Sequence, residues 1–200
     1  AERVYSCLGI AGEQKCGELM GYIAAHNTAK ALELFNKLYT EGKDLSAMLD
    51  EMAAAAEKNG KMLAIFQQSR FANYFLKVKE VIASGVLGRI VHVGIQFNGF
   101  ARRWDWQTVQ VKAAGGIYNT GPRPVGLALD YLDFDENIEV AFSKLALGLT
   151  SGDSDDYAKL ILTAPGKPVV DVEVSSMDAF PEPYVVKVMG TRGTLSATRA

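Results

Sequence analysis

The residues best arranged for chemistry lie in the segment 115–126, which has the sequence GGIYNTGPRPVG. Its glycines, prolines and threonine are typical of a loop that leads into a helix beside a substrate. Acid–base catalysis needs a titratable group within hydrogen-bond reach of the substrate proton. The candidates here are Asn119, which does not titrate, and Arg123, which stays protonated at any ordinary pH. The segment therefore predicts an enzyme-like architecture without a catalytic residue.

A second candidate is the basic and aromatic run RRWDW at residues 102–106. Arg102, Trp104 and Trp106 are side chains that stack on a sugar, a nicotinamide or an unpaired base. Together with Arg123, as an anion contact, they are the predicted ligand-binding residues. The structural alternatives stay open: Arg123 as a surface or interface arginine, and the aromatic run as a packing or oligomer contact.

Gly126 is the third unusual position, because it falls early in the predicted helix. A glycine inside a helix costs about 1 kcal/mol relative to alanine. The sequence indicates either close packing at this point or the loss of a side chain, and it does not separate the two.

Metal binding is not predicted anywhere in the chain. Asp153, Asp155 and Asp156 form a short acidic run, but a calcium loop needs more oxygen ligands and a bidentate glutamate. We expect a solvated hairpin turn there. His26 and His92 are the two histidines, and neither has a cysteine or carboxylate cluster beside it.

Composition narrows the class of protein. The 200 residues are 48% hydrophobic and 22% charged, with a net charge of -2. This balance gives no general attraction to nucleic acid, and no apolar run approaches the ~18 residues of a membrane span. The start of the chain lacks the pattern of a signal peptide. We expect a cytoplasmic protein that binds neither nucleic acid nor membrane, with Cys7 and Cys16 as reduced thiols.

The elements that must position these residues change in character near residue 60. Apolar residues recur at helical spacing before it and predict three helices at about 13–25, 28–41 and 45–59. Asn27 and the Gly42–Asp44 segment are the expected caps of the second and third helices. Residues 1–60 are thus predicted to form a small helical segment, packed with an α+β domain at 61–200.

Residues 61–200 show mainly the period of two that is typical of strands. A buried strand is expected at 62–66, a helix at 74–84 and a helix at 122–132. Further strands are expected at 89–98, 137–147, 157–163, 169–176, 184–190 and 194–198. The last four, joined by short turns, should form an antiparallel meander with Val78 and Val81 packed on one face. The other face would be open and apolar, and a soluble chain would bury it by forming a homo-oligomer.

Residues 49–200 resemble the glucose–fructose oxidoreductase, inositol dehydrogenase and MocA-type family. The resemblance rests on LDEMAAAAEKNGKMLAIFQQSRF, on YFLKVKEVIASGVLGRIVHVGIQFNG and on GGIYNTGPRPVGLALDYL. The last is similar to the family signature GG-x-x-D/N-x-G-x-H-x-x-D. It implies an open-faced mixed sheet that often mediates dimers or tetramers and supplies one wall of a substrate pocket.

Three departures from the family argue against catalysis. The signature histidine falls on Arg123 and the signature aspartate on Gly126, and the family's Glu-Lys-Pro motif is absent. Gly9, Gly12 and Gly17 do not have the spacing of a dinucleotide-binding turn. The sequence therefore predicts no bound cofactor and no enzyme activity, with Asn119, Arg123 and Gly126 as vestigial positions.

Residues 3–50 resemble a different family, the gamma/tau clamp-loader subunit of bacterial DNA polymerase III, most distinctly in LYTEGKDLSAML. Two families that meet near residues 46–52 suggest an engineered or recombined chimera. Our main hypothesis is a non-catalytic structural protein that homodimerises through its sheet face. The alternative is a divergent or relic NAD(P)-dependent oxidoreductase of sugars or polyols that retains weak ligand binding. A third hypothesis is a protein-interaction module derived from the clamp-loader segment.

Overall fold

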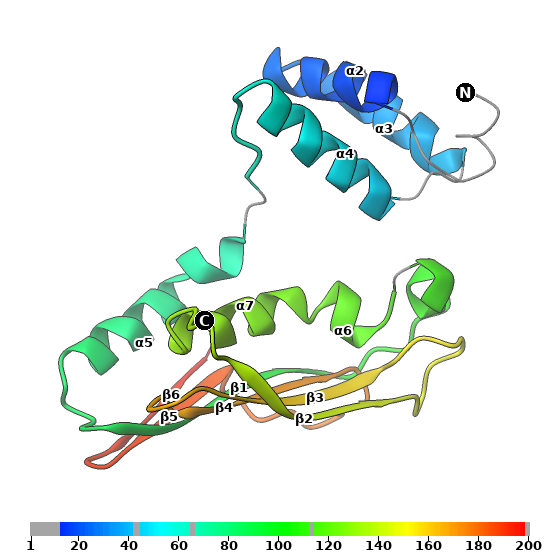
Figure 1. Cartoon of the computed structure of the whole chain (residues 1–200). Coiled ribbons are helices and arrows are strands. Elements are labelled where there is room, and N and C mark those ends of the chain that lie inside the picture. Colours follow the sequence, from blue (N-terminus) through cyan, green and yellow to red (C-terminus); the bar gives the residue numbers. More distant parts are fainter. Residues whose placement is uncertain (1–12, 42–44, 65–66, 113, 199–200) are drawn as a thin grey trace. The chain divides into compact units, whose positions relative to one another are not determined.

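The computed structural model describes residues 13–41, 45–64, 67–112 and 114–198. The chain divides into two compact units, Ala1–Phe66 and Gln67–Ala200. The first is helical and the second contains a sheet with helices on it (Figure 1). We describe each unit by itself.

The helical unit contains the three predicted helices: α2 (Glu13–Ala24), α3 (Thr28–Thr40) and α4 (Leu45–Lys58). The Asn27 side chain accepts a hydrogen bond from the backbone N–H of Lys30 at 3.2 Å and so caps α3, as expected. The expected Gly42–Asp44 cap lies outside the described residues. The apolar stripes of the three helices meet in one core, whose buried members are Cys16, Leu19, Leu34, Leu38, Met48 and Met52.

Cys16 is a free, buried thiol within that core. Burial, aided by its hydrogen bond to Glu51 at 2.8 Å, raises the pKa of Cys16 to about 12. Because the thiolate is the reactive form, Cys16 is an inert packing residue. Cys7 lies outside the described residues.

The sheet unit contains a mixed, six-stranded sheet among its described residues. Its helices and strands, in chain order, are η1 (Gln68–Phe71), α5 (Asn73–Ala83), β1 (Ile90–Asn98), η2 (Trp106–Thr108), η3 (Gln110–Lys112), α6 (Gly116–Asn119), α7 (Pro122–Tyr131), β2 (Glu139–Ala146), β3 (Tyr157–Thr163), β4 (Val169–Ser175), β5 (Val186–Gly190) and β6 (Thr194–Ala197). The strand order is β2-β3-β4-β1-β5-β6. The predicted α+β class is confirmed.

Two expectations about the strands are wrong. The four strands expected to form one meander do not do so, because β1 lies between β4 and β5, parallel to β4 and antiparallel to β5. The strand expected at 62–66 does not form over residues 62–64, where Met62 is 90% exposed and no neighbouring strand offers backbone partners. The remaining two positions, 65 and 66, lie outside the described residues.

One face of the sheet is covered by α5, α6 and α7 (Figure 1). The strands place alternate side chains on that face, so Val93, Ile95 and Val172 share one buried core with Phe75 and Val78 of α5. Burial of this apolar surface is the main favourable contribution to folding of the unit. The stripe predicted for the helix at 74–84 is confirmed.

Asp130 fixes α7, the helix that carries Arg123, to the start of the unit. Its buried carboxylate accepts hydrogen bonds from Arg70 Nε at 3.1 Å and Arg70 Nη2 at 2.9 Å, and it also pairs with Lys79 of α5. The guanidinium of Arg70 lies 4.7 Å from the ring centre of Phe134, just beyond α7. These contacts hold α7 at a defined position over the sheet.

The open face of the sheet differs in character from the apolar face that we expected. Lys159 is paired with Asp171 at 2.8 Å and with Glu173 at 3.1 Å, and Asn98 donates to Glu173 at 2.7 Å. Apolar side chains occur toward the edge strand β2, where Phe142 lies opposite Ile161. The centre of the face is thus polar, and the expectation of a continuous apolar surface is wrong.

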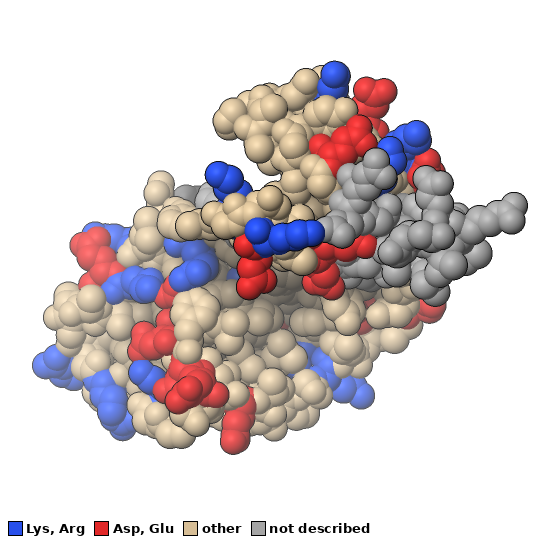
Figure 2. All heavy atoms as spheres, turned by 45° about the horizontal axis from the view of Figure 1, so that its top comes forward, with Lys and Arg blue, Asp and Glu red and all other residues tan. Residues whose placement is uncertain are grey.

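Charged residues of both signs are mixed over the surface seen in Figure 2, with no extended basic stripe. None of the helices in the described ranges is long and apolar enough to cross a membrane. That the chain binds no nucleic acid stays a prediction.

Candidate functional site

A pocket of about 270 Å³ lies in the sheet unit where β1 and β4 end and α6 and α7 begin. It brings together two of the predicted positions, Asn119 and Arg123. Its wall also contains residues from four other segments of the chain: Asn98, Gly99, Arg103, Gln107, Asp155 and Ser175. The pocket is lined mainly by polar groups.

Asp155 determines the shape of the Gly-Gly loop. Its carboxylate accepts the backbone N–H of Ile117 at 2.9 Å, and its backbone carbonyl accepts the N–H of Gly116 at 2.8 Å. Gly115 has a φ of 103°, and a β-carbon there would overlap the carboxylate. A β-carbon at Gly116 would lie 3.0 Å from Asp155 Oδ2. The two glycines are therefore needed because the buried carboxylate satisfies the start of α6.

The acidic run is not the solvated turn that we expected. Asp155 and Asp156 are each only 7% exposed. Asp156 accepts the backbone N–H groups of Gly148 at 2.7 Å and Leu149 at 2.6 Å. Both carboxylates are buried because backbone donors replace the water that they lose. Burial raises the pKa of Asp155 above its usual value, and its backbone hydrogen bonds oppose this rise.

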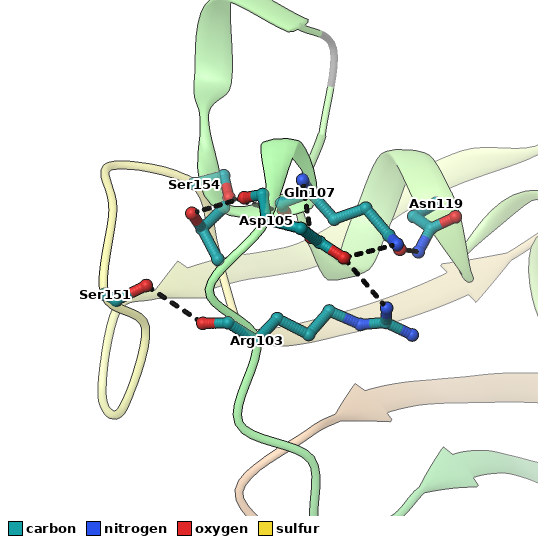
Figure 3. Close-up of polar contacts among 7 residues, drawn as sticks. Arg103, Asp105, Gln107, Asn119, Ser151 and Ser154 are labelled. Atoms are coloured by element: carbon teal, nitrogen blue, oxygen red, sulfur yellow. Dashed lines mark hydrogen bonds and ion pairs between the residues drawn. The ribbon is translucent and has the colours of Figure 1, made fainter.

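A chain of polar contacts forms one side of the pocket (Figure 3). Arg103 pairs with Asp105 at 3.7 Å, and Asp105 accepts the side-chain amide of Gln107 at 3.3 Å. The Gln107 side-chain oxygen in turn accepts a hydrogen bond from Asn119. Ser154 donates to the backbone carbonyl of Gln107 at 3.1 Å. This hydrogen bond connects the series of polar contacts to the acidic run. Sequence reasoning missed Arg103 and Gln107. The Asx pattern at Asp105, which accepts the Gln107 N–H at 2.9 Å, was the available signal.

Arg123 faces the pocket from the first turn of α7 and is half-buried. Within the described ranges, no hydrogen bond or ion pair of its guanidinium is found. It therefore places a permanent positive charge and unused donors at the pocket. Asn98 Oδ1 is a buried acceptor without a partner among the described residues, and the amide nitrogen of the same side chain donates to Glu173 on the open face of the sheet.

The remaining predicted positions are not part of this pocket. The Arg102 guanidinium lies 5.7 Å from the ring centre of Trp104, which is 76% exposed. Trp106 begins η2 and is also exposed. The position that a β-carbon would take at Gly126 has no atom within 4 Å, so close packing does not explain this glycine.

The described residues contain neither a cluster of metal ligands nor a dinucleotide-binding turn. They contain no group of three or more histidine, cysteine, aspartate or glutamate side chains that would hold a metal ion. A pyrophosphate cradle requires a glycine-rich turn from a strand into a helix, whereas Gly17 lies inside α2. Gly9 and Gly12 lie outside the described residues. We therefore derive no reaction step through a nicotinamide cofactor.

Comparison with known proteins identifies the family. Residues 75–196 match the GFO/IDH/MocA C-terminal domain. The match spans more than half of the chain, so the chain belongs to the GFO/IDH/MocA family. The matched range includes β1 to β5, all of β6 but its last residue, and the whole of the Gly-Gly segment.

Individual relatives agree with this assignment. An uncharacterized oxidoreductase of Escherichia coli (strain K12), YdgJ, is 27% identical over 122 residues, which cover 60% of this chain and 34% of that protein. An NAD-binding protein from Listeria innocua has a TM-score of 0.66 at 22% identity, over 82% of this chain and 49% of the other. GenD2 from gentamicin A biosynthesis, solved in complex with NAD, has a TM-score of 0.64 at 21% identity, over 82% and 50%. At these identities the solved structures show the fold. The chain spans about a third of the length of its curated relative.

These matches overturn our main functional hypothesis. The curated relatives are described as oxidoreductases, and the chain belongs to the GFO/IDH/MocA family. A non-catalytic chimeric or designed structural protein is therefore the wrong conclusion. The clamp-loader resemblance of residues 3–50 has no support among these proteins.

Proposed function

We propose that this chain is a divergent or relic NAD(P)-dependent oxidoreductase of sugars or polyols, and that its sheet unit provides the substrate-binding wall. The observation that carries the proposal is the pocket of about 270 Å³ at which the family's signature segment, with Asn119 and Arg123, meets the ends of β1 and β4. Family membership supports the reaction class. NAD(P) is the proposed cofactor of that class, with no step assigned to it here.

The polar lining supports a small hydroxylated ligand. The hydroxyl of Thr120 and the guanidinium of Arg123 line the pocket, and its volume lies just below the ~300 Å³ at which drug-sized ligand sites begin. A six-carbon polyol matches both the size and the pattern of donors and acceptors.

The described pocket residues bind and orient, but they do not transfer protons. Asn119 holds Gln107 by a hydrogen bond, and Arg123 stays charged. Asp155 titrates, but its carboxylate is engaged by the start of α6. The proposal therefore assigns substrate positioning to this unit and leaves the general base unassigned.

The experiment is a calorimetric titration of the whole chain with the polyol D-glucitol, repeated with Gly99→Leu. Gly99 lines the pocket, and its β-carbon position has no atom within 4 Å, so leucine fills the pocket without a backbone clash. Gly126→Leu is the matched control, because this glycine is equally uncrowded but is not in the pocket wall. Saturable binding that Gly99→Leu abolishes and Gly126→Leu keeps would support the proposal. Equal binding by all three proteins would contradict it.

Two further expectations remain proposals. We propose that the open face of the sheet pairs with a second copy of the chain, because Phe142 on the edge strand lies on this face and is 49% exposed. The cytoplasmic location expected from the sequence also stays a prediction.

NADH titration followed by fluorescence tests whether this chain itself holds the cofactor.

A further inference from the structure

We propose that Arg123 makes the pocket selective for ligands with a negative charge, so that it binds sugar acids or sugar phosphates more tightly than neutral polyols. This inference rests on the proposed function and specifies its ligand. It concerns Arg123, which lines the pocket and carries a permanent positive charge where the family resemblance implies a histidine.

The first step is the position of Arg123. It is half-buried in the first turn of α7 and lines the pocket. The helix is held in place by Asp130, which binds Arg70 and Lys79 rather than Arg123. The guanidinium is therefore presented on a fixed backbone, with no carboxylate partner in the part of the chain that the structure describes.

The second step is the state of the other charges at the pocket. Asp155 is engaged by the backbone N–H of Ile117, and Asp156 by the N–H groups of Gly148 and Leu149. Arg103 is paired with Asp105. Each of these charges has a partner within the protein, whereas Arg123 has none among the described residues. Backbone N–H groups satisfy the two carboxylates without cancelling their charge, so what a ligand meets at Arg123 is a set of charged donors without a partner among the described residues.

The third step is energetic. A partly desolvated guanidinium without a partner loses hydration that only an anion or strong acceptor replaces well. Its planar set of N–H donors matches the two oxygens of a carboxylate or phosphate, and such charge-assisted pairs are stronger than hydrogen bonds between neutral groups. Thr120, which precedes α7 and also lines the pocket, offers a hydroxyl beside it. A carboxylate on a polyol chain would use both.

The test compares two ligands that differ only at one end, D-gluconate and D-glucitol, in calorimetric titrations of the whole chain. D-glucitol 6-phosphate is the third arm, and it distinguishes a phosphate from a carboxylate preference. Three variants are compared with the unaltered chain: Arg123→Gln, Arg123→Lys and Arg102→Gln. Arg102→Gln is the matched control, because Arg102 stacks on Trp104 and does not line the pocket.

We expect one or both anions to bind at least about tenfold more tightly than D-glucitol, as loss of a charged hydrogen bond implies. Arg123→Gln should abolish this preference, Arg123→Lys should keep part of it, and Arg102→Gln should leave it unchanged. If Arg123→Gln does not fold, as judged by circular dichroism, added salt serves as the second measurement. Salt should reduce the preference of the unaltered chain for the anions.

The two proposals fail in different ways. Equal binding of all three ligands, or a preference that survives in Arg123→Gln or is insensitive to salt, overturns the anion selectivity and leaves the proposed function intact. No binding of any of the three ligands contradicts both.

Discussion

The carboxylate of Asp155 occupies the space beside Gly115 in which any larger residue would place its β-carbon. The same carboxylate accepts the N–H of Ile117 and starts α6, 38 positions earlier in the chain. The conformation of the signature loop thus depends on a buried acid on a distant segment. Asn119 and the start of α7 come next in the chain, so their positions depend on the conformation of this loop.

Removing the Asp155 carboxylate should destabilise the loop. Asp155→Ala leaves the Ile117 N–H without its acceptor, and we expect a loss of about 1–2 kcal/mol in the free energy of unfolding, similar to the loss of a helix cap. Asp155→Asn keeps an acceptor oxygen and should lose less. Urea denaturation monitored by circular dichroism measures both. Equal stability of all three proteins would show that the carboxylate does not support α6.

The pH dependence of the same group has a defined sign. Burial raises the pKa of Asp155 above that of the unfolded chain. The folded state therefore holds the proton more tightly, and the stability from this group is full below the unfolded pKa of about 4 and is lost as pH rises through the folded pKa. Asp155→Asn should be less costly at about pH 7 than at about pH 3. A cost that grows with pH would contradict this environment for Asp155.

Gly115 should not tolerate a side chain. Gly115→Ala combines a left-handed φ of 103° with a steric overlap on Asp155. We expect a loss of about 1–3 kcal/mol in unfolding free energy. Gly126→Ala is the control, because that position is open and lies inside a helix, where alanine is favoured by about 1 kcal/mol. Thermal melts that show the two variants changing alike would disprove the role of the loop conformation.

Glu173, on the open face of the sheet, should give a pH dependence of stability opposite to that of Asp155. Although burial raises the pKa of Glu173, hydrogen bonds from Asn98 and Lys159 hold it below its usual value. Its stabilising contribution is present above the unfolded pKa and is lost as pH falls through the folded pKa. We expect Glu173→Gln to cost about 1–2 kcal/mol at pH ~7 and less at pH ~3. Denaturation curves at the two pH values measure this, and an unchanged cost would contradict the ion-pair network.

The sequence patterns predicted the elements well but not their partners. Periodicity placed α5, α7 and the six strands, because burial of one face imposes a period on each element separately. It did not reveal that β1 inserts between β4 and β5, since strand order depends on contacts between distant residues.

The site was also predicted only in part, because local patterns are visible in the sequence and contacts between distant residues are not. Asn119 and Arg123 lie at the pocket because the loop and helix that carry them were identified locally. The acidic run was misjudged because the donors that bury Asp155 come from α6. The Asx pattern at Asp105 marked a local turn near Arg103 and Gln107, but it did not show that Gln107 pairs with Asn119, 12 positions later, at the pocket.

Self-association through the open face can be tested at Phe142. This side chain lies toward the sheet edge and is 49% exposed, and a glutamate there would place a charge into an apolar contact. We expect light scattering to give a dimer mass for the unaltered chain and a monomer mass for Phe142→Glu. Val86→Glu, at an exposed position after α5, should leave the mass unchanged. A monomeric unaltered chain would contradict the proposal.

The central claim is that the pocket between the strand ends and α6–α7 binds the substrate of an oxidoreductase. Its most direct test is a nitrogen-15 amide spectrum of the whole chain, recorded with increasing D-gluconate and D-glucitol. The account predicts saturable shifts concentrated at pocket residues, with Gly99, Asn119 and Thr120 among them. Shifts that are absent, or that fall instead on the exposed Trp104 segment or the open face of the sheet, would contradict it.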